Sequence, residues 1–152
     1  LLNDKNPVDA LNKIKNQNVS SNKKLERSHN ELIGYYIKDL KKNLELINGI
    51  NFCAIEFSCD PNVLKNLAFK AGKEIENLFL VLCSSFEGKA YVMCYISKNL
   101  TESHNINAQN IIKKLGDSIG GTGGGQSFFA TATGNNISGI KNVINKSKEF
   151  IN

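Results

Sequence analysis

The chain has 152 residues, of which 41% are hydrophobic, and its 19 basic and 14 acidic side chains leave a net charge of +5. This length allows one modest hydrophobic core with one additional non-globular element, and it argues against two full domains. The longest apolar runs have the length of strands, far below the roughly 20 residues that a membrane helix needs, so no membrane span is expected.

The basic charge permits binding to a polyanion without establishing it. Arg27 is the only arginine, so the paired hydrogen bonds with which arginine reads guanine are largely unavailable. Any bound nucleic acid would be recognised mainly by its shape and backbone.

The chain begins at Leu1 rather than at a methionine, and it contains no cationic stretch followed by an apolar run of signal-peptide length. We therefore expect a fragment of a longer cytoplasmic protein. The cysteines stand in apolar, strand-like surroundings, where we expect buried and reduced thiols. They are Cys53, Cys59, Cys83 and Cys94.

Residues 8–47 are predicted to form a long helix or a helical hairpin that Asn48-Gly49 ends, because they are rich in Lys, Asn, Glu and Leu and contain no proline. We interpret residues 1–48 as a spacer. A heptad seam is only half apolar, which indicates weak coiled-coil pairing at most. It consists of Leu11, Asn18, Leu25 and Leu32, with Ile14, Ser21, Ser28 and Tyr35 offset by three residues. After it, an apolar stripe suited to packing on a core follows at Tyr36, Leu40, Leu44 and Ile47.

Residues 49–152 are predicted to form a globular domain with the order β-α-β-β-α-β-α. This order implies an α+β or mixed α/β fold, in which helices pack on a mixed sheet. Asp60 is the predicted N-cap of the first of these helices, and Ser138 of the last. The predicted strands are 51–58, 78–84, 89–96 and 128–133, and the middle helix is 108–119.

The sequence offers no set of residues that could run a reaction. Its two histidines, His29 and His104, have no Cys or carboxylate partner at ligand spacing, and no CxxC or HExxH element occurs. We therefore predict no catalytic, cofactor-binding or metal-binding residue in this chain.

Eight of the twelve glycines fall between Gly116 and Gly139, and they are densest in residues 120–125. A phosphate-binding P-loop or a dinucleotide fold would need a strand before the glycines and a helix after them, which is the reverse of the predicted order. Two interpretations remain open. The exposed backbone could approach a ligand such as a sugar-phosphate chain, or the glycines could serve a tight internal turn.

Residues 120–134, GGTGGGQSFFATATG, closely resemble the glycine-rich signature at the C-terminus of bacterial alanyl-tRNA synthetases. The flanking residues 48–52, 77–82 and 146–150 look like the same domain, in the same order. Upstream, residues 6–11 are similar to the start of the helical segment that joins the editing domain to it. The resemblance therefore covers essentially the whole chain.

The resemblance implies the DHHA1-type C-terminal domain with part of the preceding helical linker. In that family this domain grips the outer corner of tRNA, where the D and T loops meet, and helps the aminoacylation and editing sites share one substrate. It can also contribute to homodimer contacts. ATP and zinc would be needed only in the domains that this chain lacks.

Carried over to this sequence, the resemblance places a candidate RNA-approaching loop at Gly121, Gly123, Gly124, Gly125 and Gln126. We expect Gly124→Val and Gly125→Val to weaken tRNA binding without changing thermal stability. Lysines on the two flanking helices are further candidates for phosphate contacts: Lys113, Lys114, Lys141 and Lys146.

Two other interpretations are possible. The same domain type closes DHH-family phosphoesterases, whose glycine-rich loop leads into a histidine that meets the substrate phosphate, but Gln126 stands at that place here. Alternatively, the segment 8–47 pairs with a second copy of itself, and the chain is a structural oligomerisation module.

Overall fold

The computed structural model describes the backbone of residues 7–152 and the side chains of residues 22–152. The chain divides into two units, the first ending at Tyr35 and the second comprising Tyr36–Asn152. No helix of the described chain is long and apolar enough to cross a membrane.

The N-terminal segment forms one continuous helix, α1, over Pro7–Lys42, so the hairpin alternative is excluded. The first part of the predicted heptad seam, up to Ser21, lies outside the residues whose side chains are described. On its later part, the side chains of Leu25 and Tyr35 are exposed, by 57% and 70%.

The prediction that the helix continues to Ile47 is wrong. The Asn43 side chain donates a 2.7 Å hydrogen bond to the carbonyl of Asp39 in the last turn, and a short strand, β1, follows at Glu45–Ile47. Asn48 and Gly49 have φ angles of 51° and 80°, as a two-residue hairpin turn of type I′ requires. Leu44 and Ile47 therefore do not extend the helical stripe.

The domain is built on a mixed six-stranded sheet with the order β1-β2-β3-β4-β6-β5. Only β2 and β3 are parallel neighbours, and the other pairs are antiparallel. The predicted fold class is confirmed, with two strands that the sequence did not indicate, β1 and β5. The other strands are β2 Ile50–Glu56, β3 Leu78–Phe86, β4 Lys89–Ile96, β5 Gly121–Gly125 and β6 Phe129–Gly134.

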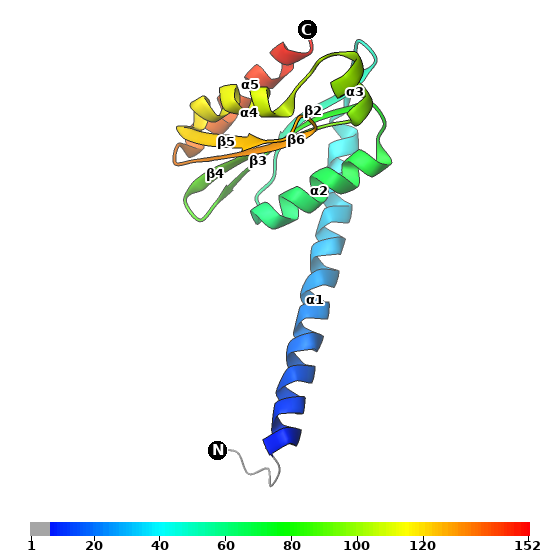
Figure 1. Ribbon diagram of the computed structural model, residues 1–152, viewed down its shortest axis with the longest axis vertical. Coiled ribbons are helices and arrows are strands. Elements are labelled where there is room, and N and C mark those ends of the chain that lie inside the picture. Colours follow the sequence, from blue (N-terminus) through cyan, green and yellow to red (C-terminus); the bar gives the residue numbers. More distant parts are fainter. Residues whose placement is uncertain (1–6) are drawn as a thin grey trace. The chain divides into compact units, whose positions relative to one another are not determined.

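Helices cover the sheet unequally on its two faces (Figure 1). Helices α4 (Ala108–Gly116) and α5 (Ile140–Ser147) lie on one face, where Ile112, Leu115 and Val143 join the main apolar core. Helix α2 (Pro61–Glu74) lies on the opposite face and packs on β3 and β4. A short helix, α3, covers Lys98–Ser103.

One of the two predicted N-caps is present in the structure. Asp60 caps α2 as predicted, with its carboxylate 2.7 Å from the backbone nitrogen of Asn62. The prediction that Ser138 caps the last helix is wrong, because Ser138 lies inside a 3-10 turn and donates to the side chain of Asn136 at 2.6 Å. Helix α5 begins after that turn, at Ile140.

All four cysteines are buried and unpaired, as predicted.

Candidate functional site

The glycine-rich stretch is a strand and not a loop. Gly121–Gly125 forms β5, the edge strand of the sheet, which pairs antiparallel with β6 so that Gly123 faces Ala132 and Gly124 faces Thr131. Gln126 opens the hairpin turn, and its backbone N–H donates to the carbonyl of Phe129 at 2.8 Å. The prediction of a loop is therefore wrong for the four glycines.

Close packing inside the domain accounts for three of these glycines. A Cβ on Gly123 would stand 2.6 Å from Cβ of Ala132 and 2.7 Å from Cγ2 of Ile112. A Cβ on Gly121 would stand 2.6 Å from Cα of Gly134.

Gly125 is equally constrained, because its Cβ would lie 2.5 Å from Cα of Ala130 and its φ is 155°. Real Cβ atoms do not approach backbone this closely, so a side chain there would displace β6. The geometry contradicts our expectation that Gly125→Val leaves the fold unchanged.

Gly124 differs from its neighbours. A Cβ on Gly124 would meet no atom within 4 Å, and its φ lies outside the range that favours glycine. Successive residues of a strand point to opposite faces. Because Gly123 faces Ile112 of α4, Gly124 faces the other side of the sheet. Nothing in the described part of the chain requires a glycine at this position.

We call the surface around Gly124 the open face. It consists of Thr122 and Gly124 of β5 and Thr131 and Thr133 of β6, on the side of the sheet opposite α4. Thr122, Gly124 and Thr133 are exposed and Thr131 is half-buried. Residues 118–140 carry no charged side chain, so this surface offers hydroxyl groups and backbone.

Helix α2 borders the open face through an aromatic cluster. The ring of Phe69 lies 4.8 Å from that of Phe129 on β6 and 5.8 Å from that of Tyr95 on β4. Lys65 precedes Phe69 by one helical turn, which places both on the same flank of α2. Sequence reasoning missed Lys65, because only the packing of Phe69 against β6 shows which flank of the helix lies beside the glycine-rich strand.

The opposite flank of α2 carries Lys70 and Glu74. Lys41 at the end of α1 lies 2.8 Å from the carboxylate of Glu74. The hydrogen bond from Lys41 lowers the pKa of that carboxyl. The acidic side chain of α2 is therefore paired on the flank away from the open face.

The four candidate lysines of the flanking helices lie on the other side of the sheet. Lys113 and Lys114 belong to α4, Lys141 and Lys146 belong to α5, and all four are exposed. The ammonium group of Lys114 stands 5.8 Å from the ring centre of Phe150. The structure therefore does not bring these lysines and Gly124 together on one surface.

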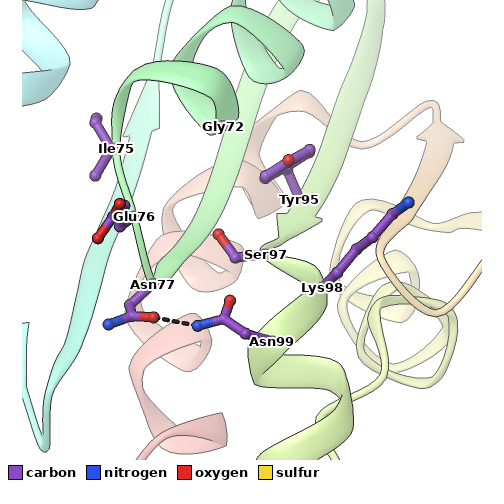
Figure 2. Close-up of a pocket in the computed structure, with 8 residues that line it drawn as sticks. All are labelled: Gly72, Ile75, Glu76, Asn77, Tyr95, Ser97, Lys98 and Asn99. Carbon is purple, nitrogen blue, oxygen red and sulfur yellow. Dashed lines mark hydrogen bonds between the residues drawn. The ribbon is translucent and has the colours of Figure 1, made fainter.

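A cavity of about 360 Å³ lies at the end of α2, where Figure 2 shows Tyr95 beside Gly72. Its polar groups largely bond within the protein. The amide of Asn99 donates to the side chain of Asn77, and Ser97 accepts a 2.9 Å hydrogen bond from the backbone of Leu78. Burial raises the pKa of Tyr95.

The two histidines lie in different parts of the chain. His29 lies on α1, and His104 follows α3, where its Nδ1 is 2.7 Å from the hydroxyl of Ser103. In the part of the chain that the structure describes, no group of three or more His, Cys, Asp or Glu side chains could hold a metal ion.

Residues 48–152 match the sequence model of the DHHA1 domain. The chain belongs to the DHHA1 domain family. It is 37% identical to an alanine–tRNA ligase of Christiangramia forsetii and 37% identical to one of Flavobacterium psychrophilum. These matches cover 99% and 97% of this chain but only 17% of each ligase, so this DHHA1 chain spans about a sixth of those relatives.

A solved structure shows the same fold. The C-Ala domain of Aquifex aeolicus alanyl-tRNA synthetase superposes with a TM-score of 0.65 at 21% sequence identity. The superposition covers 71% of this chain and 96% of that domain. The resemblance to the C-terminal domain of alanyl-tRNA synthetases that the sequence predicts is thereby confirmed.

Proposed function

We propose that this chain is the tRNA-binding C-terminal module of an alanine–tRNA ligase and catalyses no reaction by itself. The observation that carries the proposal is the match of 99% of the chain to 17% of a ligase of that name. In the complete cytoplasmic ligase, the module would hold the outer corner of the tRNA and help the aminoacylation and editing sites share it. ATP and zinc would be bound by the other domains.

The charge of the domain supports an RNA partner. Residues 36–152 contain thirteen lysines and ten carboxylates, a net charge of +3. Lysines that contact phosphates release counterions, so binding of this kind weakens as salt increases. Since the sequence has one arginine, on α1, recognition would depend on the shape of the RNA rather than on guanine edges.

A second function rests on α1. Leu25 and Tyr35 belong to the predicted heptad seam and are largely exposed, which favours pairing of this helix with a second copy. Sedimentation equilibrium of the chain with and without Leu25→Lys tests this. A dimer that Leu25→Lys dissociates supports the pairing, and a monomer at all concentrations contradicts it.

The phosphoesterase alternative has less support, since Gln126 stands in place of the histidine that it needs.

The main proposal is tested by following the fluorescence anisotropy of labelled RNA at two salt concentrations. We expect the chain to bind whole tRNA, to bind more weakly at the higher salt, and not to bind an acceptor-stem minihelix, which lacks the outer corner. Equal binding of both RNAs would contradict the role at the corner, and binding of neither would contradict the RNA-binding function.

A further inference from the structure

We propose that the RNA backbone crosses the domain over the open face, with Gly124 as the point of closest approach and Lys65 as a phosphate contact. This inference rests on the proposed function and deepens it. It keeps Gly124 from the sequence-based expectation, and it replaces the candidate lysines of α4 and α5, which lie on the opposite side of the sheet, with Lys65.

Gly124 leaves the backbone of β5 open to a close approach. The other glycines of β5 are required by contacts with β6 or α4, whereas a side chain on Gly124 would project into free space above the open face. A glycine at an exposed strand position weakens the strand, since it has no side chain to pack. Such a position is expected where another backbone approaches closely.

The side chains around Gly124 carry hydroxyl groups. Thr122 and Thr133 are direct partners across the two strands, and Thr131 faces Gly124. Their hydroxyls can donate to phosphate oxygens, which are frequent partners of serine and threonine in nucleic-acid complexes. Because no charged side chain occurs in residues 118–140, no carboxylate of these strands repels a phosphate.

A positive charge lies at the border of the open face. Lys65 lies on the flank of α2 that carries Phe69 and Gly72, at the spacing i, i+4 and i+7. Both of those residues meet the sheet beside the open face, Phe69 at Phe129 and Gly72 at the ring of Tyr95. The carboxylate of Glu74, on the other flank, is paired with Lys41. The open face is therefore bordered by the positive charge of Lys65, which the carboxylate of Glu74 does not neutralise.

A sugar-phosphate backbone fits this surface better than the edges of bases do. The open face consists of glycine and threonine and carries no charged side chain, so it offers no large or charged side chain to read the edge of a base. It provides hydroxyl donors, accessible backbone and the bordering ammonium group of Lys65, which together recognise phosphates independently of the sequence.

The test compares matched variants of the whole chain in the tRNA titration. Gly124→Val should weaken binding on the order of tenfold, because the added side chain would hold the RNA backbone away from the strand and cost about one charged hydrogen bond to phosphate. Circular dichroism and the thermal midpoint should be unchanged. Lys65→Ala should weaken binding and lower the slope of log K against log salt by roughly 0.9. The control Lys70→Ala removes the same charge from the opposite flank of α2 and should bind like the wild type.

Three results would overturn the inference. If Gly124→Val and Lys65→Ala bind like the wild type while Lys113→Ala or Lys141→Ala binds weakly, RNA uses the other side of the sheet, and the proposed function stands. If Gly124→Val changes the oligomeric state in sedimentation while RNA binding is unchanged, the open face is an interface between copies. If the wild-type chain binds no tRNA, the proposed function itself fails.

Discussion

Gly123 of β5 lies directly against Ile112 of α4, because a Cβ on Gly123 would stand only 2.7 Å from the Cγ2 methyl of that isoleucine. Gly124, the next residue, has open space where its side chain would be. Packing inside the protein therefore requires a glycine at position 123. No contact within the described part of the chain requires one at position 124.

This difference predicts unequal effects on stability. Gly123→Ala should lower the free energy of unfolding by about 1–3 kcal/mol, since the added methyl overpacks the contact between β5, β6 and α4. Gly124→Ala should change it by less than about 0.5 kcal/mol, as surface substitutions usually do. Urea titration followed by circular dichroism measures both, and equal effects of the two variants would contradict the assignment of the two faces.

Ser84 is a buried hydroxyl whose loss should be costly. Its side chain donates to the carbonyl of Cys59 at 2.6 Å and accepts from the backbone nitrogen of Cys59 at 3.4 Å. Ser84→Ala leaves that carbonyl without this donor and should reduce the free energy of unfolding by about 1–3 kcal/mol. Ser85→Ala, at the neighbouring half-buried position, is the control, and an equally small loss in both variants would argue against the hydrogen bond.

The buried thiols predict a loss of stability in alkaline solution. Burial raises the pKa of Cys59 to about 11 and that of Cys53 to about 12, and the charges of Asp60 and Glu45 respectively add to the shifts. The hydrogen bond with Ser84 partly opposes the shift of Cys59. An unfolded thiol titrates near 8.5, so the folded form retains protons that the unfolded form loses.

Because the pKa values of both thiols are raised in the folded protein, the thiols stabilise the folded form only while they stay protonated. The contribution of the thiols is fully present below about pH 8.5 and is lost as the pH rises through the folded-state values. The free energy of unfolding should therefore fall between pH 8.5 and pH 10.5, and it should fall less in the double variant Cys53→Ala, Cys59→Ala. Urea midpoints at several pH values measure this, and parallel pH profiles of the two proteins would rule it out.

The turn between β1 and β2 should depend on its glycine. Gly49 has a φ of 80°, which costs other residues about 1–2 kcal/mol, so Gly49→Ala should lower the thermal midpoint. Gly34→Ala is the matched control, because Gly34 lies within α1 with nothing within 4 Å of its Cβ position, and alanine is the better helix former. A lower midpoint for both variants would contradict this interpretation.

Local patterns were sufficient to predict most of the elements but not the edges of the sheet. Strands β2, β3 and β4 are long and apolar enough to be predicted where they occur. Strand β1 was missed because its three residues continue an apparent helical stripe, although Asn48-Gly49 is a recognised hairpin signal. Strand β5 was missed because glycines show no alternation of apolar and polar side chains.

The sequence by itself determined the mixed α/β fold class and the relationship to alanyl-tRNA synthetases, since both depend on local residue order. It could not distinguish Gly123 from Gly124, which are chemically identical neighbours. The tertiary structure decided between them, because side chains alternate across a strand and α4 packs on only one face of β5. The sequence also does not show which flank of α2 lies beside β6. Lys65 became a candidate because Phe69, on the same flank, packs against Phe129 in the structure.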